Sequence, residues 1–235
     1  MAAVKRPVKA LPMKIVTLHY LFDPLCGWCY GAAPLLAAAH SLPEVQIELH
    51  AGGMLTGSNR RAINPQWRSY VLPHDRRIAE LSGQPFGDGY FNGLLNDQGA
   101  VLDSEPPISA ILAAQAIAGQ GLVMLQRVQH AHYVEGRRIA DLQVLVELAG
   151  ELGFPLPQFS NAYQAVRGRQ TQAHIAASRA LLAQVGAQGF PTLLLEDAQG
   201  RMQALELSHY LGRPQQWLSY LRTELARVAG AAASE

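Results

Sequence analysis

Segments with the pattern of β-strands lie only toward the two ends of this chain, and helical patterns fill about a hundred residues between them. Near the N-terminus, Lys14–Phe22 is rich in β-branched and aromatic residues, and Glu44–His50 alternates apolar with polar side chains. Between them, Cys26–Ser41 is rich in alanine and leucine, which favour helix, although Pro34 predicts a kink. A strand, a helix and a strand within about forty residues predict a βαβ unit with two parallel strands.

The middle of the chain, from about residue 60 to residue 169, shows no convincing strand alternation. Asp103 or Ser104 predicts the N-cap region of one helix in this block, and Asp141 predicts the cap of a later one. The glycine-rich stretch 83–93 follows no predicted strand and opens no clear helix, so we interpret it as a loop and not as a phosphate-binding site. The block is therefore predicted to be all-helical.

One more long helix is predicted over Thr171–Gly189, and strand patterns return after it. Thr192–Glu196 and Met202–Leu207 flank a short turn and predict an antiparallel hairpin. Arg213–Ala229 predicts a closing helix with a proline in its first turn. The predicted order is βαβ, helical block, helix, ββ and helix, which indicates an α/β protein.

The formal net charge of +1 gives no electrostatic reason to expect nucleic acid or an anionic membrane as a partner. No stretch approaches the ~18 consecutive apolar residues of a membrane-spanning helix. Residues 1–12 are basic and show no apolar period, and no small-residue cleavage site follows the first apolar segment. We therefore expect a loose tail, no signal peptide and a reducing, cytoplasmic location.

The chain has two cysteines, Cys26 and Cys29, and they stand three positions apart. In a reducing compartment this C-x-x-C spacing indicates a redox-active or metal-binding pair. Asp23-Pro24 signals a turn, so Cys26 is predicted at a helix N-terminus, where the helix dipole and free backbone N–H groups stabilise a thiolate. Cys29 follows one helical turn later on the same face, which supplies an attacking thiol and a resolving thiol. Asp23 acts in the opposite direction, because a nearby carboxylate raises the pKa of a thiol.

A proline far from the cysteines marks a second feature. Pro191 follows Gly189 and Phe190 and stands immediately before a predicted strand. Because proline cannot donate a hydrogen bond to a sheet, it is expected at a strand start or a turn. A cis peptide bond between Phe190 and Pro191 would expose the backbone of Phe190 to a partner chain.

These features together carry a resemblance. "CGWC" after a strand, Pro34 five residues past the second cysteine, and "GFPT" before a terminal ββα pattern resemble the thioredoxin superfamily. The helical block between the two halves resembles the DsbA-type branch. "DPLCGWCYGA", "DSEPP" and "HYVEGRRIAD" are most similar to its cytosolic FrnE-like members, predicted disulfide isomerases. The resemblance implies a thioredoxin-like fold with a large all-helical insertion between its βαβ and ββα halves.

The expected domain organisation follows from these patterns. Residues 1–12 are expected to be a flexible tail, and residues 13–60 together with 170–229 to form the thioredoxin-like domain. Residues 61–169 are expected to form the helical insertion domain, and residues 230–235 a frayed C-terminus.

The resemblance also implies roles for individual residues. Cys26 is the catalytic nucleophile and Cys29 the resolving thiol, and the two form a redox-active disulfide; Pro191 is the cis-proline that borders the substrate groove. Trp28 and Phe190 are candidate substrate contacts. The alternatives are that Trp28 packs on the helical block, and that Phe190 is a core aromatic whose backbone alone serves the site. No cofactor is expected.

Metal binding is the weaker interpretation of these residues. Zinc generally takes four ligands, and no second C-x-x-C completes a site with Cys26 and Cys29, so no metal is expected. His130 and His132, two positions apart on a helix, face different directions. His19 lies inside the first predicted strand, where a core histidine is the main interpretation and tuning of Cys26 the alternative.

The expected function is thiol–disulfide exchange, as a reductase or isomerase, on a disulfide-containing protein or a small thiol substrate. Glutathione or a thioredoxin system is the expected reductant. Two alternatives stay open. One is a glutathione-dependent isomerase or transferase of the same fold branch, whose members typically carry serine at the position of Cys26. The other is a non-catalytic peptide-binding or chaperone-like module.

Overall fold

The computed structural model describes residues 15–197 and 199–231 of the chain. Within these residues, the main sheet has four strands in the order β2-β1-β5-β6. β1 pairs with β2 in parallel, whereas β5 is antiparallel to both β1 and β6, so the predicted βαβ unit and hairpin are confirmed. The strands are β1 (Val16–Phe22), β2 (Val45–Ala51), β5 (Thr192–Glu196) and β6 (Met202–Leu205).

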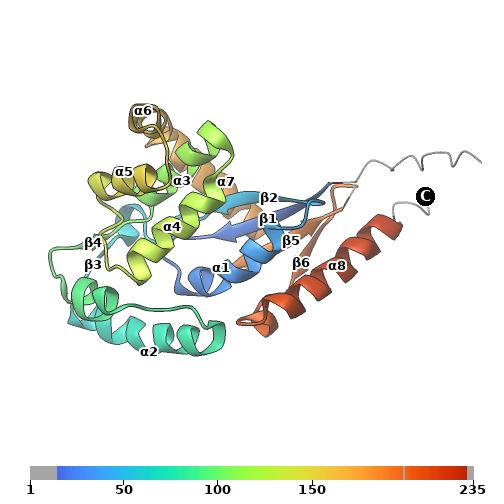
Figure 1. The fold of residues 1–235 in the computed structure, drawn as a ribbon, viewed down its shortest axis with the longest axis horizontal. Coiled ribbons are helices and arrows are strands. Elements are labelled where there is room, and N and C mark those ends of the chain that lie inside the picture. Colours follow the sequence, from blue (N-terminus) through green and yellow to red (C-terminus); the bar gives the residue numbers. More distant parts are fainter. Residues whose placement is uncertain (1–14, 198, 232–235) are drawn as a thin grey trace, which may run out of the picture.

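Two helices cover one face of this sheet. Tyr20 in β1 points toward α1 (Gly27–His40), because its hydroxyl donates to the backbone oxygen of Cys29 at 3.3 Å. Helix α8 (Pro214–Ala231) lies beside α1 (Figure 1). The fully buried Trp217 of α8 donates from Nε1 to the Leu35 oxygen of α1 at 3.0 Å. Helix α8 therefore packs against α1, the helix that begins at the cysteines, and is hydrogen-bonded to it.

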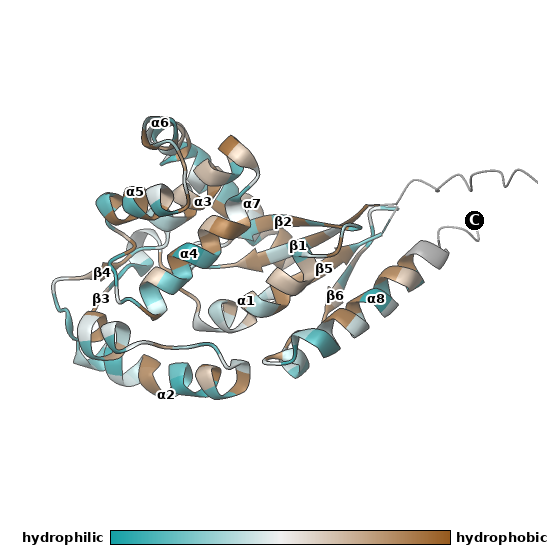
Figure 2. Cartoon of the chain, viewed as in Figure 1, coloured by the Kyte–Doolittle hydropathy of each residue, from teal (hydrophilic) through white to brown (hydrophobic). Residues whose placement is uncertain are grey.

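The hydropathy of the elements agrees with these positions. Figure 2 shows β1 and β5 mostly in the colours of hydrophobic residues and α8 with alternating hydrophobic and hydrophilic turns. This is the pattern of central strands and of a helix that buries one face. No helix in the described residues combines the length and apolarity needed to cross a bilayer.

Helices α2 to α7 make up most of the interval between β2 and β5, in agreement with the predicted helical insertion. Helix α3 packs on α4, α6 and α7, and these helices gather at one end of the sheet (Figure 1). Ser109 Oγ and Thr171 Oγ1 share a buried hydrogen bond of 2.8 Å that joins α3 to α7. The helices are α2 (Pro65–Ser82), α3 (Glu105–Ala118), α4 (Gly121–Tyr133), α5 (Leu142–Glu151), α6 (Leu156–Val166) and α7 (Arg169–Gln184).

Two local predictions for this block are wrong. Arg61–Ala62 (β3) and Val101–Leu102 (β4) form a short antiparallel ladder where no strand is expected from the sequence. Strands of two residues are too short to show an alternating pattern. The stretch 83–93, expected as a loop, contains a π-helical turn over Gly89–Gly93, followed by a 3-10 turn over Leu94–Asn96.

Two helices differ in how their N-termini are capped. Helix α2 begins at Pro65, where Asn64 caps it by accepting from the Trp67 backbone N–H at 2.8 Å. Asp141 stands at the N-cap of α5 as predicted, but its side chain makes no capping hydrogen bond.

The outer domain boundaries stay predictions. Helix α8 extends to Ala231, two residues past its expected end at Ala229. The predicted tail over residues 1–12 and most of the predicted frayed end lie outside the described residues.

Candidate active site

The two cysteines occupy different environments at the start of α1. Cys26 is the N-cap residue, 7% exposed, and its Sγ lies 3.5 Å from the Phe190 carbonyl oxygen, to which the thiol donates. Cys29, one turn later, is fully buried, and both cysteines are free thiols. Of the two cysteines, only Cys26 therefore keeps any exposed surface, and it stands at the N-terminus of a helix.

Burial raises the pKa of the Cys29 thiol well above its usual value, and the neighbouring Cys26 thiol and the Asp23 charge act in the same direction. A hydrogen bond with the backbone of Asp23 acts in the opposite direction and is the smaller effect. Cys29 is therefore held as a neutral thiol in the reduced protein, and it cannot compete with Cys26 for an incoming disulfide.

Asp23 is a buried acceptor that joins three segments. Its carboxylate accepts from Leu25 N at 2.9 Å, Met54 N at 2.5 Å and Ser104 Oγ at 2.9 Å. Burial raises its pKa to about 6, although these three hydrogen bonds and Arg179 favour the charged form. Ser104, predicted as a helix cap, makes no capping bond with its side chain and donates to Asp23 instead. Asp103 Oδ1 accepts from Glu105 N at 2.9 Å, beside that cap position.

The helix that carries the cysteines is packed closely against α2. A Cβ atom on Gly27 would lie 2.8 Å from Ile78 Cδ1, and one on Gly31 would lie 2.8 Å from Ile78 Cγ2. The glycine between the cysteines therefore lets α2 approach the start of α1.

Pro34 lies inside α1, as the sequence requires, and its missing N–H leaves the Tyr30 carbonyl without its usual helical donor. Gln84 Nε2 donates to that oxygen at 3.1 Å. A side chain from the insertion thus completes the hydrogen bonding of the cysteine-bearing helix.

The Phe190–Pro191 peptide bond is cis, as predicted. The Phe190 backbone oxygen faces Cys26, whereas its half-buried ring packs on Gly52, where a Cβ atom would lie 1.9 Å from Cζ. Arg179 in α7 donates to the oxygens of Gly52 and Gly53 at 2.7 and 2.5 Å. The ring of Phe190 therefore packs against the loop after β2 while its backbone borders the thiol, and its role as a substrate contact stays a prediction.

A cavity of about 750 Å³ opens beside Cys26 between the start of α1 and helix α2. The half-buried Trp28 lies in its wall and also packs against the core, and its role as a substrate contact stays a prediction. Phe190 and Pro191 are not in this wall. The remaining wall is a mixture of apolar, aromatic and polar side chains, among them Met54, Asn59, Arg61, Asn64, Trp67 and Asp75.

Three buried polar groups in this wall were not predicted from the sequence. Tyr90 Oη donates to Asp75 Oδ2 at 2.8 Å, and burial raises the pKa of Asp75 to about 6. The ring of His132 lies 5.3 Å from that of Tyr90, and burial lowers the pKa of His132 to about 3. The only sequence signal for Asp75 is an acid on the apolar side of an amphipathic helix.

Replacing Asp75 by asparagine is expected to remove a pH dependence of stability. The folded protein holds the Asp75 proton more tightly than the unfolded chain, whose carboxyl keeps a pKa of about 3.8. This contribution favours folding below about pH 4 and is lost as the pH rises through 6. The free energy of unfolding of wild type relative to Asp75→Asn should therefore fall by up to about 3 kcal/mol from pH 4 to 7.5.

Urea unfolding across this pH range measures the difference. Asp88→Asn, on an exposed carboxylate of the same region, is the matched control and should leave the pH profile unchanged. Parallel profiles for wild type and Asp75→Asn would contradict the prediction.

The histidines singled out from the sequence lie apart from the thiols. His19 is buried, as the main interpretation holds, and makes no hydrogen bond with either cysteine among the described residues. His130 is half-exposed and pairs with Glu135 at 2.9 Å, whereas His132 is buried. These two therefore do not share a site, as predicted.

The dithiol stands at the start of a helix, and the carbonyl before a cis-proline faces its first sulfur. This combination defines a thiol–disulfide oxidoreductase of thioredoxin fold. The chain belongs to the DsbA-like thioredoxin family: the model of the DSBA-like thioredoxin domain matches residues 17–210.

Solved structures agree with this assignment. The cytosolic disulfide reductase DsbM from Pseudomonas aeruginosa is 54% identical and covers 89% of this chain and 98% of its own, with a TM-score of 0.84. The same protein with GSH is 52% identical, over 89% of this chain and 99% of its own, with a TM-score of 0.83. Pseudomonas aeruginosa DsbA, 16% identical over 99% and 93% of the two chains at a TM-score of 0.53, shares the fold. No curated protein sequence matches the chain.

Proposed function

We propose that this protein is a cytosolic disulfide reductase that uses glutathione as its reductant, with Cys26 as nucleophile and Cys29 as resolving thiol. The observation that carries the proposal is the difference between the two sulfurs: Cys26 borders a cavity, and Cys29 is sealed behind it. The likeness to a cytosolic disulfide reductase, including its structure with GSH, supports the compartment and the reductant.

The proposed reaction proceeds in four thiol–disulfide exchanges, two that reduce the substrate and two that regenerate the dithiol. The Cys26 thiolate attacks one sulfur of the substrate disulfide, releases the other as a thiolate and forms a mixed disulfide. Cys29 loses its proton and attacks the Cys26 sulfur, which releases the second substrate thiol and leaves a Cys26–Cys29 disulfide. Two glutathione molecules then reduce this disulfide and leave as glutathione disulfide. The net reaction converts one substrate disulfide and two glutathiones into two substrate thiols and one glutathione disulfide.

The cavity beside Cys26 has a size and lining that suit a tripeptide thiol. Its volume of about 750 Å³ lies within the usual range for small-ligand sites. Arg61 in its wall forms no ion pair within the described residues, so its guanidinium is available to a ligand carboxylate. Asn59 and Asn64 add amide groups that can hydrogen-bond a peptide backbone.

Reduction of insulin disulfides by glutathione, coupled to glutathione reductase and NADPH, tests the activity. Wild type should exceed the glutathione blank, and the Cys26→Ser/Cys29→Ser double variant should equal it. Wild type no faster than the blank would overturn the reductase proposal. Glutathione turnover that survives in the double variant would point to the isomerase or transferase alternative. Suppression of client aggregation as the only activity, unchanged in the double variant, would point to the chaperone-like alternative.

The same assay tests the glutathione site. Arg61→Gln should raise the KM for glutathione about fivefold, since a solvated ion pair contributes roughly 1 kcal/mol. Arg60→Gln is the matched control, because the neighbouring Arg60 does not line the cavity and instead pairs with Asp103 at 3.7 Å. Equal KM values for the two variants would show that Arg61 does not contact glutathione.

A further inference from the structure

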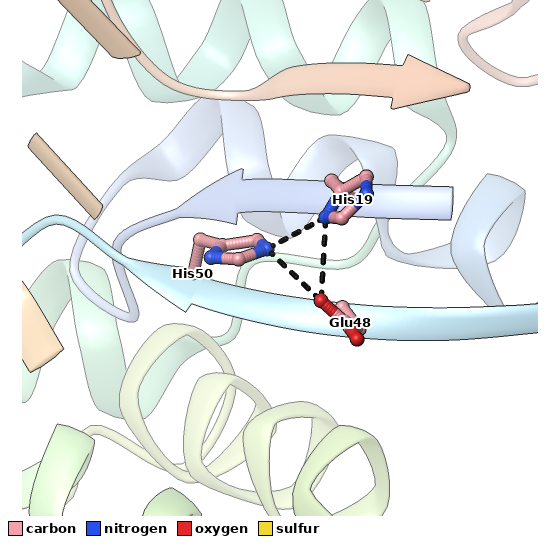
Figure 3. Close-up of side chains that lie close together, drawn as sticks. All are labelled: His19, Glu48 and His50. Carbon is pink, nitrogen blue, oxygen red and sulfur yellow. Dashed lines mark hydrogen bonds and ion pairs between the residues drawn. The ribbon is translucent and has the colours of Figure 1, made fainter. Parts of the chain in front are cut away.

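Two histidines and a carboxylate converge on the sheet away from the cysteines. His19 of β1 is the register partner of Glu48 in β2, and His50 lies two residues further along β2, so all three project from the same side (Figure 3). Tyr20, the next residue in β1, points toward α1, so His19 points to the opposite face. In sequence His19 stands about thirty positions before Glu48 and His50, and this spacing gives no metal-binding motif.

The distances between the three ligating atoms fit one coordination sphere. His19 Nδ1 lies 3.0 Å from His50 Nε2 and 3.4 Å from Glu48 Oε2, and His50 Nε2 lies 3.8 Å from Glu48 Oε2. Ligands placed about 2.0–2.1 Å from a tetrahedral zinc ion lie about 3.4 Å from one another. The three separations centre on that value, so small side-chain shifts suffice to place one ion among these atoms.

A second carboxylate orients the central histidine. Glu196 Oε2 accepts from His19 Nε2 at 2.8 Å, which places the His19 proton on Nε2 and leaves Nδ1 free to bind through its lone pair. A carboxylate behind a histidine is the usual outer partner of a zinc-bound imidazole. In this tautomer His50 donates from Nε2 to His19 Nδ1. When a cation binds between the two rings, the His50 Nε2 proton is lost to solvent and solvent protonates His50 Nδ1, so both imidazoles bind as neutral ligands.

The neighbouring side chains limit this cluster to three protein ligands. His174 is committed elsewhere, because its Nε2 accepts from the Ala51 backbone N–H at 3.0 Å. The side chains of Glu48 and His50 are 49% and 20% exposed, so a fourth position is open to water. Imidazole and carboxylate ligands in this number suit a borderline divalent cation.

We propose that His19, Glu48 and His50 bind Zn²⁺ with water as the fourth ligand, and that Glu196 positions His19. The ion joins β1 to β2, so it clamps the parallel pair formed by β1 and the edge strand β2. Binding to the folded state alone stabilises the protein as the Zn²⁺ concentration rises. The site lies on the face opposite α1 and takes no part in the exchange reaction.

The full-length Cys26→Ser/Cys29→Ser variant is the background for the test, because a C-x-x-C pair itself binds zinc. Titration with Co²⁺, as a spectroscopic substitute, should give visible absorption bands of a four-coordinate nitrogen and oxygen site, saturating at one ion per chain. Calorimetry with Zn²⁺ should give the same stoichiometry, and the melting temperature should rise with Zn²⁺.

Variants of the cluster assign the ligands. Glu48→Gln and His50→Gln should each weaken Zn²⁺ binding at least tenfold, and Glu196→Gln should weaken it about 10- to 100-fold. His40→Gln, at the exposed end of α1, and His130→Gln, which breaks another histidine–carboxylate pair, are matched controls and should bind as the background does. Because Glu48 is half exposed, its variant is expected to fold and carries the test. Unchanged affinity in Glu48→Gln and His50→Gln, or no saturable binding in the background, would overturn the proposal.

Discussion

Cys29→Ser is expected to accumulate as a mixed disulfide with its substrate, joined through Cys26. Attack by Cys26 needs only its own sulfur, which borders the cavity, and this step is unaffected by the substitution. Release of the substrate needs the buried thiol of Cys29, and serine cannot perform that exchange. Incubation with glutathione disulfide, acid quenching and intact mass spectrometry should show one glutathionyl group on nearly every chain.

The matched variant is Cys26→Ser, which keeps the other thiol of the pair. Cys29 is fully buried and its raised pKa keeps it protonated, so this variant should carry almost no adduct. Equal labelling of the two variants would contradict the assignment of Cys26 as nucleophile and Cys29 as resolving thiol.

Trp217→Ala is expected to cause the largest loss of stability among simple truncations of this protein. The side chain is fully buried between α8 and α1, and its indole N–H donates to the Leu35 oxygen. Truncation of a buried tryptophan costs about 3–5 kcal/mol through lost burial and the cavity left behind. Urea unfolding should therefore show a much lower midpoint with an unchanged slope.

Trp67→Ala is the control for this measurement. Trp67 is half-buried, and its Nε1 has no hydrogen-bond partner among the described residues, so its truncation should cost clearly less. A loss for Trp217→Ala no larger than that for Trp67→Ala would contradict the structural role assigned to α8.

The architecture could be predicted from the sequence because its signals are local. β1 is buried along most of its length, β2 alternates, and the hairpin has a short turn, so each segment has its own pattern. The cysteines and Pro191 were found for the same reason, since a C-x-x-C pair and a proline before a strand are visible in a few consecutive residues.

What could not be predicted depends on contacts between distant segments. Ser104 has the local signature of a helix cap, yet its hydroxyl serves Asp23, which lies 81 positions earlier. The partner of Asp75 is Tyr90, and nothing in the glycine-rich stretch around Tyr90 indicates that pairing. The approach of Phe190 to Gly52 is equally invisible, because a glycine needed for close packing resembles a glycine in any turn.

The hydrogen bond from Gln84 to Tyr30 makes the cysteine-bearing helix depend on the helical insertion. The insertion supplies that donor, as well as Ile78 against Gly27 and the hydroxyl of Ser104 for Asp23. A deletion variant without residues 61–169 would keep the C-x-x-C sequence but lose these three supporting groups. Transfer of the cysteine motif to another protein therefore requires the segments that carry Ile78, Gln84 and Ser104 as well as α1.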